Sequence, residues 1–130
     1  MENDYLKNIG QRLRFVRSIF NEGKKLSTEQ FAHLLGESRD NIANYEHARA
    51  SVPARVLIEL YKRGINPTWV LTGDGDVFTN NLQGKQRRKL MKERGIDMSE
   101  IKELAKVEFE EHKEVKVLKV AAGKIKNRGT

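Results

Sequence analysis

The side chains of this chain that can do chemistry offer hydrogen bonds rather than nucleophiles or metal ligands. The sequence contains no cysteine, and His33, His47 and His112 stand singly, without the spacing of a metal site. Asp74-Gly75-Asp76 starts like a calcium loop but lacks the third ligand and the terminal glutamate, so it predicts a turn. No glycine-rich phosphate loop is present. We therefore expect no enzymatic activity, no metal site and no cofactor.

Polar side chains concentrate in residues 27–49, where two short helices are predicted to meet across a turn. Ser27 or Thr28 caps the first helix, and Gln30 stands three residues after Ser27, as a capping box requires. Gly36 supplies the positive φ of the turn, and Ser38 caps the second helix, over residues 39–47. The apolar residues of the seam are Phe31, Ala32, Leu35 and Ile42. This pattern predicts a helix-turn-helix, whose second helix enters the major groove of DNA.

The elements that must hold this pair are also predicted to be helical. Apolar residues recur at three- and four-residue steps over residues 4–20, and Tyr5, Phe15 and Phe20 are expected in or near the core. Pro53 opens a further helix through residue 62, and Pro67 starts a short one closed by Gly73. The fold class is therefore all-α: a five-helix DNA-binding domain over residues 1–80, followed by a charged, helical C-terminal extension over residues 81–130.

The net charge of +7 is distributed unevenly along the chain. Residues 1–80 hold 11 Lys and Arg against 10 Asp and Glu, whereas residues 81–130 hold 14 against 8. A basic protein is a candidate for binding nucleic acid, but here the excess of positive charge lies in the extension. The case for the first domain therefore depends on its helical pattern.

Several separated motifs of the first domain resemble one known family. They are residues 9–17 (IGQRLRFVR), 26–32 (LSTEQFA), 38–42 (SRDNI), 45–46 (YE) and 64–75 (GINPTWVLTGDG). Together they resemble the lambda-repressor-like (XRE-type) DNA-binding domains, and the last motif is similar to the closing segment of phage repressor N-terminal domains. The resemblance covers residues 6–78 and excludes the extension.

The resemblance implies a set of DNA-binding residues at one end of the domain. Arg39, Asp40 and Asn41 begin the recognition helix, and an arginine can bind guanine while an aspartate can accept from cytosine N4. Thr28 matches a phosphate-binding position at the start of the preceding helix. The candidate DNA-binding residues are Thr28, Gln30, Arg39, Asp40, Asn41, Asn44, His47 and Arg49. The family also implies a buried scaffold ion pair between Arg17 and Glu46.

Two features depart from the family pattern. Where the family usually has Asn-Gly after the recognition helix, this chain has His47-Ala48, and the connection over residues 21–25 is a residue or two longer than usual. Asp40 would place a negative charge close to DNA, which is itself negatively charged. It contributes to specificity, pairs with Arg39, or caps the helix.

The resemblance implies a transcriptional regulator, most simply a repressor that binds a palindromic operator as a homodimer. The alternatives are an antitoxin, which binds its operator and neutralises a partner protein through the tail, and a restriction controller. The acidic start of the chain is unlike a signal peptide, and no apolar run approaches the length of a membrane span. We expect a cytoplasmic protein of a bacterium or a phage.

The extension itself allows several interpretations. Residues 80–84 are predicted to be a linker, and a basic helix is predicted from residue 85 to near Gly95. Residues 114–121 fit either a strand or a continuing helix, with helix favoured. The tail is a solvated appendage, a dimerisation element, or a further DNA or protein contact, and residues 85–89 (KQRRK) are its best electrostatic candidate.

Overall fold

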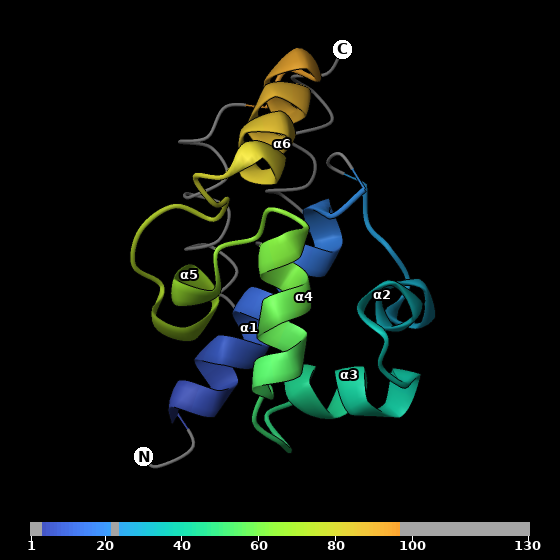
Figure 1. Cartoon of the computed structure of the whole chain (residues 1–130). Coiled ribbons are helices and arrows are strands. Elements are labelled where there is room, and N and C mark those ends of the chain that lie inside the picture. The colour runs from blue at the N-terminus through green and yellow to red at the C-terminus, as the bar shows by residue number, and fades with distance from the viewer. Residues whose placement is uncertain (1–3, 22–23, 97–130) are drawn as a thin grey trace, which may run out of the picture.

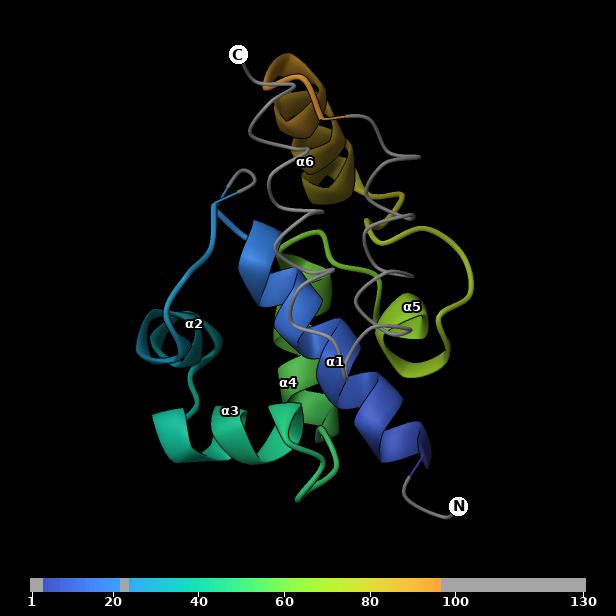
Figure 2. The same cartoon turned by 180° about the vertical axis from the view of Figure 1, so that it is seen from behind.

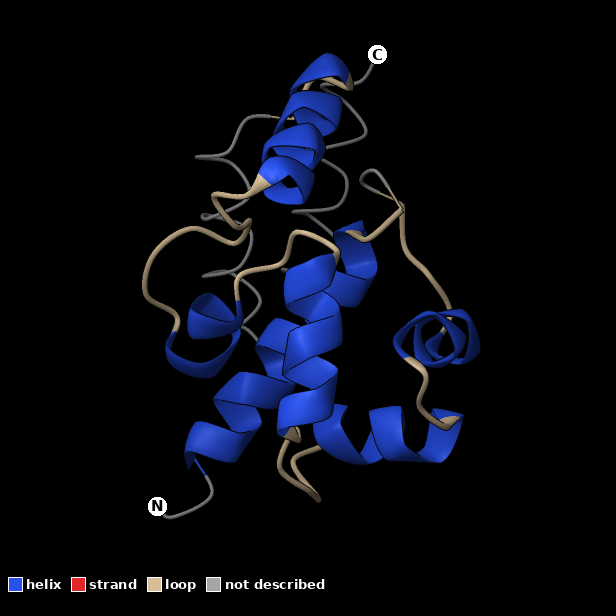
Figure 3. Ribbon diagram, in the orientation of Figure 1, coloured by secondary structure: helices blue, strands red, loops and turns tan. Residues whose placement is uncertain are grey.

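The computed structural model describes residues 4–21 and 24–96, and every regular element among them is helical (Figures 1 and 3). This confirms the predicted all-α class for that part of the chain. The helices are α1 (Asp4–Ile19), α2 (Thr28–Leu35), α3 (Arg39–Glu46), α4 (Ala54–Lys62), α5 (Pro67–Thr72) and α6 (Leu82–Glu93). The predictions for residues 97–130, including the choice between strand and helix, lie outside the described residues.

Local capping groups decide where α2 and α3 begin. The Ser27 hydroxyl accepts from the Gln30 amide at 3.1 Å, and Gln30 Oε1 accepts from the Ser27 amide at 2.9 Å, which completes the predicted capping box. Ser38 caps α3 in the same way, because its hydroxyl accepts from the Asn41 amide at 3.1 Å. Both helix starts are therefore encoded within four residues of sequence.

The apolar faces of the first five helices meet in one core. α3 contacts both α1 and α2, and α5 contacts both α1 and α4. Figures 1 and 2 show α3 at one end of the molecule and α6 at the opposite end. The largest fully buried side chains are Leu13, Val16, Phe31, Ile42, Val56, Leu60, Ile65, Val70 and Val77. The core therefore joins α2 and α3 to the other helices.

The predicted linker over residues 80–84 is wrong, because α6 starts inside it. The side chain of Asn81 accepts from the Gly84 amide at 3.0 Å, and Gly84 is buried so closely that a Cβ would overlap the Thr79 carbonyl. Arg87 donates to the main-chain carbonyls of Phe20, at 2.8 Å, and Arg63. The sequence of this segment is polar, but its partners are carbonyls that lie far away along the chain.

The aromatic predictions for the domain divide. Phe15 and Phe20 are buried as predicted, and the Phe15 ring packs 5.9 Å from that of Trp69. The prediction that Tyr5 lies in or near the core is wrong, because Tyr5, in the first turn of α1, is 60% exposed. Among the described residues, no helix combines the length and the apolar character that a bilayer span requires.

Candidate nucleic-acid interface

The turn between α2 and α3 sets one helix across the end of the other. Gly36 adopts φ 69°, and the next amide, that of Glu37, donates to the Ala32 carbonyl at 2.9 Å. This left-handed termination ends α2 and redirects the chain within two residues. In Figure 1, α2 is seen end-on while α3 runs across below it. Phe31, Ala32, Leu35 and Ile42 are buried, as the sequence predicted for the seam. α2 and α3 are therefore two short helices that pack against each other across a tight turn.

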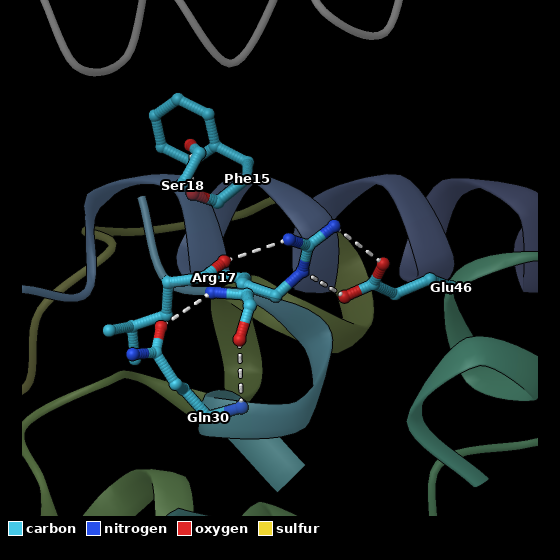
Figure 4. Close-up of polar contacts among 7 residues, drawn as sticks. Phe15, Arg17, Ser18, Gln30 and Glu46 are labelled. Atoms are coloured by element: carbon cyan, nitrogen blue, oxygen red, sulfur yellow. Dashed lines mark hydrogen bonds and ion pairs between the residues drawn. The ribbon is translucent and has the colours of Figure 1, made fainter. Parts of the chain in front are cut away.

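A buried ion pair ties α3 to α1 (Figure 4). Arg17 Nε and Nη2 donate to the two carboxylate oxygens of Glu46 at 2.8 and 3.0 Å, and Nη1 donates to the Leu26 carbonyl at 2.9 Å. Both side chains are almost fully enclosed. Because all three contacts fix the plane of the guanidinium, the pair holds the C-terminal end of α3 in one orientation.

A glycine allows α1 and α3 to approach closely beside that ion pair. A Cβ placed on Gly10 would lie 2.6 Å from the Glu46 carbonyl oxygen and 2.7 Å from that of Tyr45. Contacts of that length do not occur for a real side chain, so any larger residue would push the helices apart. Gly10 was part of the motif over residues 9–17, but no local pattern in that motif indicated this contact.

The N-terminal side chains of α3 face solvent. Arg39 and Asp40 are both exposed. In the described part of the chain, no ion pair joins them, and Ser38 rather than Asp40 caps the helix. Two of the three explanations for Asp40 are therefore removed, and a part in specificity remains a prediction.

Asn41 is held by the buried carboxylate of Glu37, which no pattern in the sequence indicated. Its Nδ2 donates to Glu37 Oε1 at 2.9 Å, while Tyr45 and Arg55 contact Glu37 Oε2 at 3.4 and 2.8 Å. The Glu37 side chain is 4% exposed, whereas Arg55, at the start of α4, is 66% exposed. Burial alone would raise the pKa of Glu37, but the hydrogen bond from Asn41 and the charge of Arg55 outweigh it, and the pKa lies below its ordinary value.

The end of α3 keeps a left-handed turn without glycine. Ala48 adopts φ 62°, its amide donates to the Tyr45 carbonyl at 3.2 Å, and the Arg49 amide donates to the Asn44 carbonyl at 2.8 Å. These are the two hydrogen bonds of a Schellman motif. His47-Ala48 therefore forms a left-handed turn although neither residue is glycine. His47 is exposed at the helix end, and Arg49 Nε donates to Asn44 Oδ1 at 3.1 Å.

Two further candidate residues, Thr28 and Gln30, lie in the first turn of α2. Thr28 is the first residue of α2 and is partly exposed. The amides of a first helical turn have no carbonyl partner within the helix, which favours an anion there. Gln30 is exposed, and its Oε1 is already engaged by the Ser27 amide. Its predicted contact with DNA would therefore involve the remaining amide nitrogen.

The basic residues at 85–89 do not join this surface. They belong to α6, which lies at the end of the molecule opposite α3 in both Figure 1 and Figure 2. Arg87 and Arg88 donate to the main-chain carbonyls of Phe20, Arg63, Phe78 and Thr79. Lys85 and Lys89 are exposed. Two of the four cations, Arg87 and Arg88, therefore hold α6 against the rest of the protein.

Comparison of the chain with protein-family models, with curated proteins and with solved structures gives no significant match. The described residues also contain no group of three His, Cys, Asp or Glu side chains that could hold a metal ion. The geometry of α2, α3 and the residues that hold them therefore provides the evidence on function.

Proposed function

We propose that this protein is a sequence-specific DNA-binding regulator of the lambda-repressor-like type, and that α3 is its recognition helix. The observation that carries the proposal is the combination of two features of α3. Its N-terminal side chains, Arg39 and Asp40, are exposed, while its other end is fixed to α1 by the buried contact between Arg17 and Glu46. A helix held in this way can enter a major groove without first becoming ordered.

The surrounding groups suit the phosphates on either side of that groove. Arg49 and His47 are exposed at the end of α3, and Thr28 stands at the start of α2. Contacts to phosphate orient a protein on the duplex, and contacts to base edges then supply the sequence preference. In this proposal Arg39 donates to guanine, Asp40 accepts from cytosine N4, and the asparagines contact the following bases or phosphates.

We further propose that two copies bind one palindromic operator and repress by occupying a promoter. A single recognition helix contacts only a few base pairs. Two copies with recognition helices about 34 Å apart would address successive major grooves on one face of the duplex. The antitoxin alternative depends largely on residues beyond 96, and no described residue favours it.

Selection of bound sequences from a random duplex pool at fixed salt tests the proposal. We expect the wild type to enrich a two-fold-symmetric motif, with two chains per duplex by sedimentation or light scattering. Arg39→Ala should relax the preference at one position of each half-site. The matched control is Lys62→Ala, which removes an exposed cation from the end of α4 farther from α3 and should leave the motif unchanged.

A failure of the selection would be unambiguous. If the wild type enriches no motif and binds duplexes only weakly, with an affinity controlled entirely by salt, the protein is not an operator-binding regulator.

A further inference from the structure

The Glu37 carboxylate can accept a hydrogen bond from the side-chain amide of Asn41 but cannot donate one. Its Oε1 accepts from Asn41 Nδ2 at 2.9 Å, and its Oε2 is held by Arg55 at 2.8 Å and by the Tyr45 hydroxyl at 3.4 Å. An ionised carboxylate has no proton to give. Because the ion pair with Arg55 and the lowered pKa both favour the ionised form, Glu37 acts toward Asn41 as an acceptor only.

This environment distinguishes the two ends of the Asn41 amide. If the amide turned over, Oδ1 would face Glu37 Oε1, and two acceptors would meet without a proton between them. Glu37 cannot turn away to relieve that contact, since Arg55 and Tyr45 hold its other oxygen. Asn41 therefore has one stable orientation, in which Oδ1 points away from Glu37.

We infer that Glu37 is a positioning residue: it binds one N–H of Asn41 and leaves Oδ1 free toward DNA, so that Oδ1 selects a base carrying an exocyclic amino group. This inference rests on the proposed function. In the major groove, adenine N6 and cytosine N4 are donors, while guanine O6 and thymine O4 are acceptors. On the strand that Asn41 contacts, adenine and cytosine are thus favoured over guanine and thymine at one position of each half-site.

The first step compares the motifs that the wild type and Asn41→Ala select. The base pair whose preference is lost in the variant is the one that Asn41 contacts. Binding is then measured to four operators that carry each of the four base pairs there. For the wild type we expect the two duplexes with the amino base on the contacted strand to bind about tenfold tighter than the other two.

Glu37→Gln should reduce that ratio to below about threefold, because a glutamine can either donate or accept and so tolerates both orientations of Asn41. The double variant Glu37→Gln with Asn41→Asp should restore it. The introduced aspartate offers only acceptors, the introduced glutamine can donate to it, and the exchange conserves the total charge. A purely structural role for Glu37 would not predict recovery of one base preference by this exchange.

Glu59→Gln is the matched control, since Glu59 binds Arg63 and Lys62 on α4, away from α3, and all other base preferences should stay unchanged. Thermal unfolding shows whether each variant is folded at the binding temperature. A wild-type preference for guanine or thymine, an unchanged ratio in Glu37→Gln, or no recovery in the double variant each overturns the inference. If the wild type selects no motif at all, the proposed function itself fails.

Discussion

At the scale of single residues, Ala48 carries backbone strain that its neighbours do not. It is the non-glycine residue with positive φ in the described part of the chain, and the equivalent positions after α2, α4 and α6 are Gly36, Gly64 and Gly95. A left-handed conformation costs an L-residue with a Cβ roughly 1–2 kcal/mol. The hydrogen bonds of the turn and the fixed end of α3 maintain it.

Ala48→Gly should therefore raise the free energy of unfolding by about 1 kcal/mol, as the relief of strain is partly offset by the freedom of glycine in the unfolded chain. Urea denaturation measures the change. Ala50→Gly is the control at an ordinary loop position, where the same replacement should give no gain. Equal stabilisation by both variants would show that strain at Ala48 is not the cause.

The carboxylate of Glu37 should make stability depend on pH. Its pKa is lower in the folded protein than in the unfolded chain, so its contribution is present above the ordinary glutamate pKa and is lost as pH falls through the lowered value. As the pH is lowered from 7 to about 3, the thermal unfolding temperature should fall more steeply for the wild type than for Glu37→Gln. Parallel curves for the two proteins would contradict this assignment.

At the scale of elements, helix caps could be predicted from the sequence and helix contacts could not. Ser27, Gly36 and Ser38 act within a few residues of themselves, so their types and spacing predicted how α2 ends and how α2 and α3 begin. Arg87 acts on carbonyls at residues 20 and 63, and no local pattern reports that contact. The candidate site shows the same division, because Asn41 was predicted, but its hydrogen bond to Glu37 and the ion pair of Glu37 with Arg55 were not.

Substitutions at the contact between α1 and α3 should lower the free energy of unfolding more than substitutions at the exposed ion pairs. Glu46→Ala leaves the Arg17 guanidinium buried without its carboxylate, and we expect a loss of about 3–5 kcal/mol in the free energy of unfolding. Glu59→Ala removes one partner of the more exposed ion pair with Arg63 and should cost far less, because exposed ion pairs contribute little to stability. Chemical denaturation of both variants measures the difference, and similar losses would contradict the structural role of Arg17 and Glu46.

At the scale of the whole molecule, charge is separated from the candidate interface. The excess of positive charge begins with α6, yet α3 lies at the opposite end of the molecule. If α3 is the recognition helix, as proposed, net charge is a poor guide to the face that binds DNA. In the proposed function, the exposed groups on α3 supply the contacts with bases, and the basic residues of α6 do not take part.

This separation predicts how operator binding responds to salt. Arg49→Ala should lower the slope of log affinity against log salt by about 1, as expected for one lost phosphate contact. Lys85→Ala removes an exposed cation of α6 and should leave the slope unchanged. A comparable decrease with Lys85→Ala would place α6 on the DNA and overturn the proposed orientation.

The turn after α3 also makes the stability of the protein depend on the chirality of the Cα atom of residue 48. A D-amino acid has the mirror-image backbone preference, so D-alanine at position 48 would favour the φ of 62° that L-alanine adopts there under strain. It would keep the methyl group and, unlike glycine, would not enlarge the set of conformations open to the unfolded chain. Inverting a single stereocentre at Ala48 should therefore stabilise the protein more than replacing it with glycine.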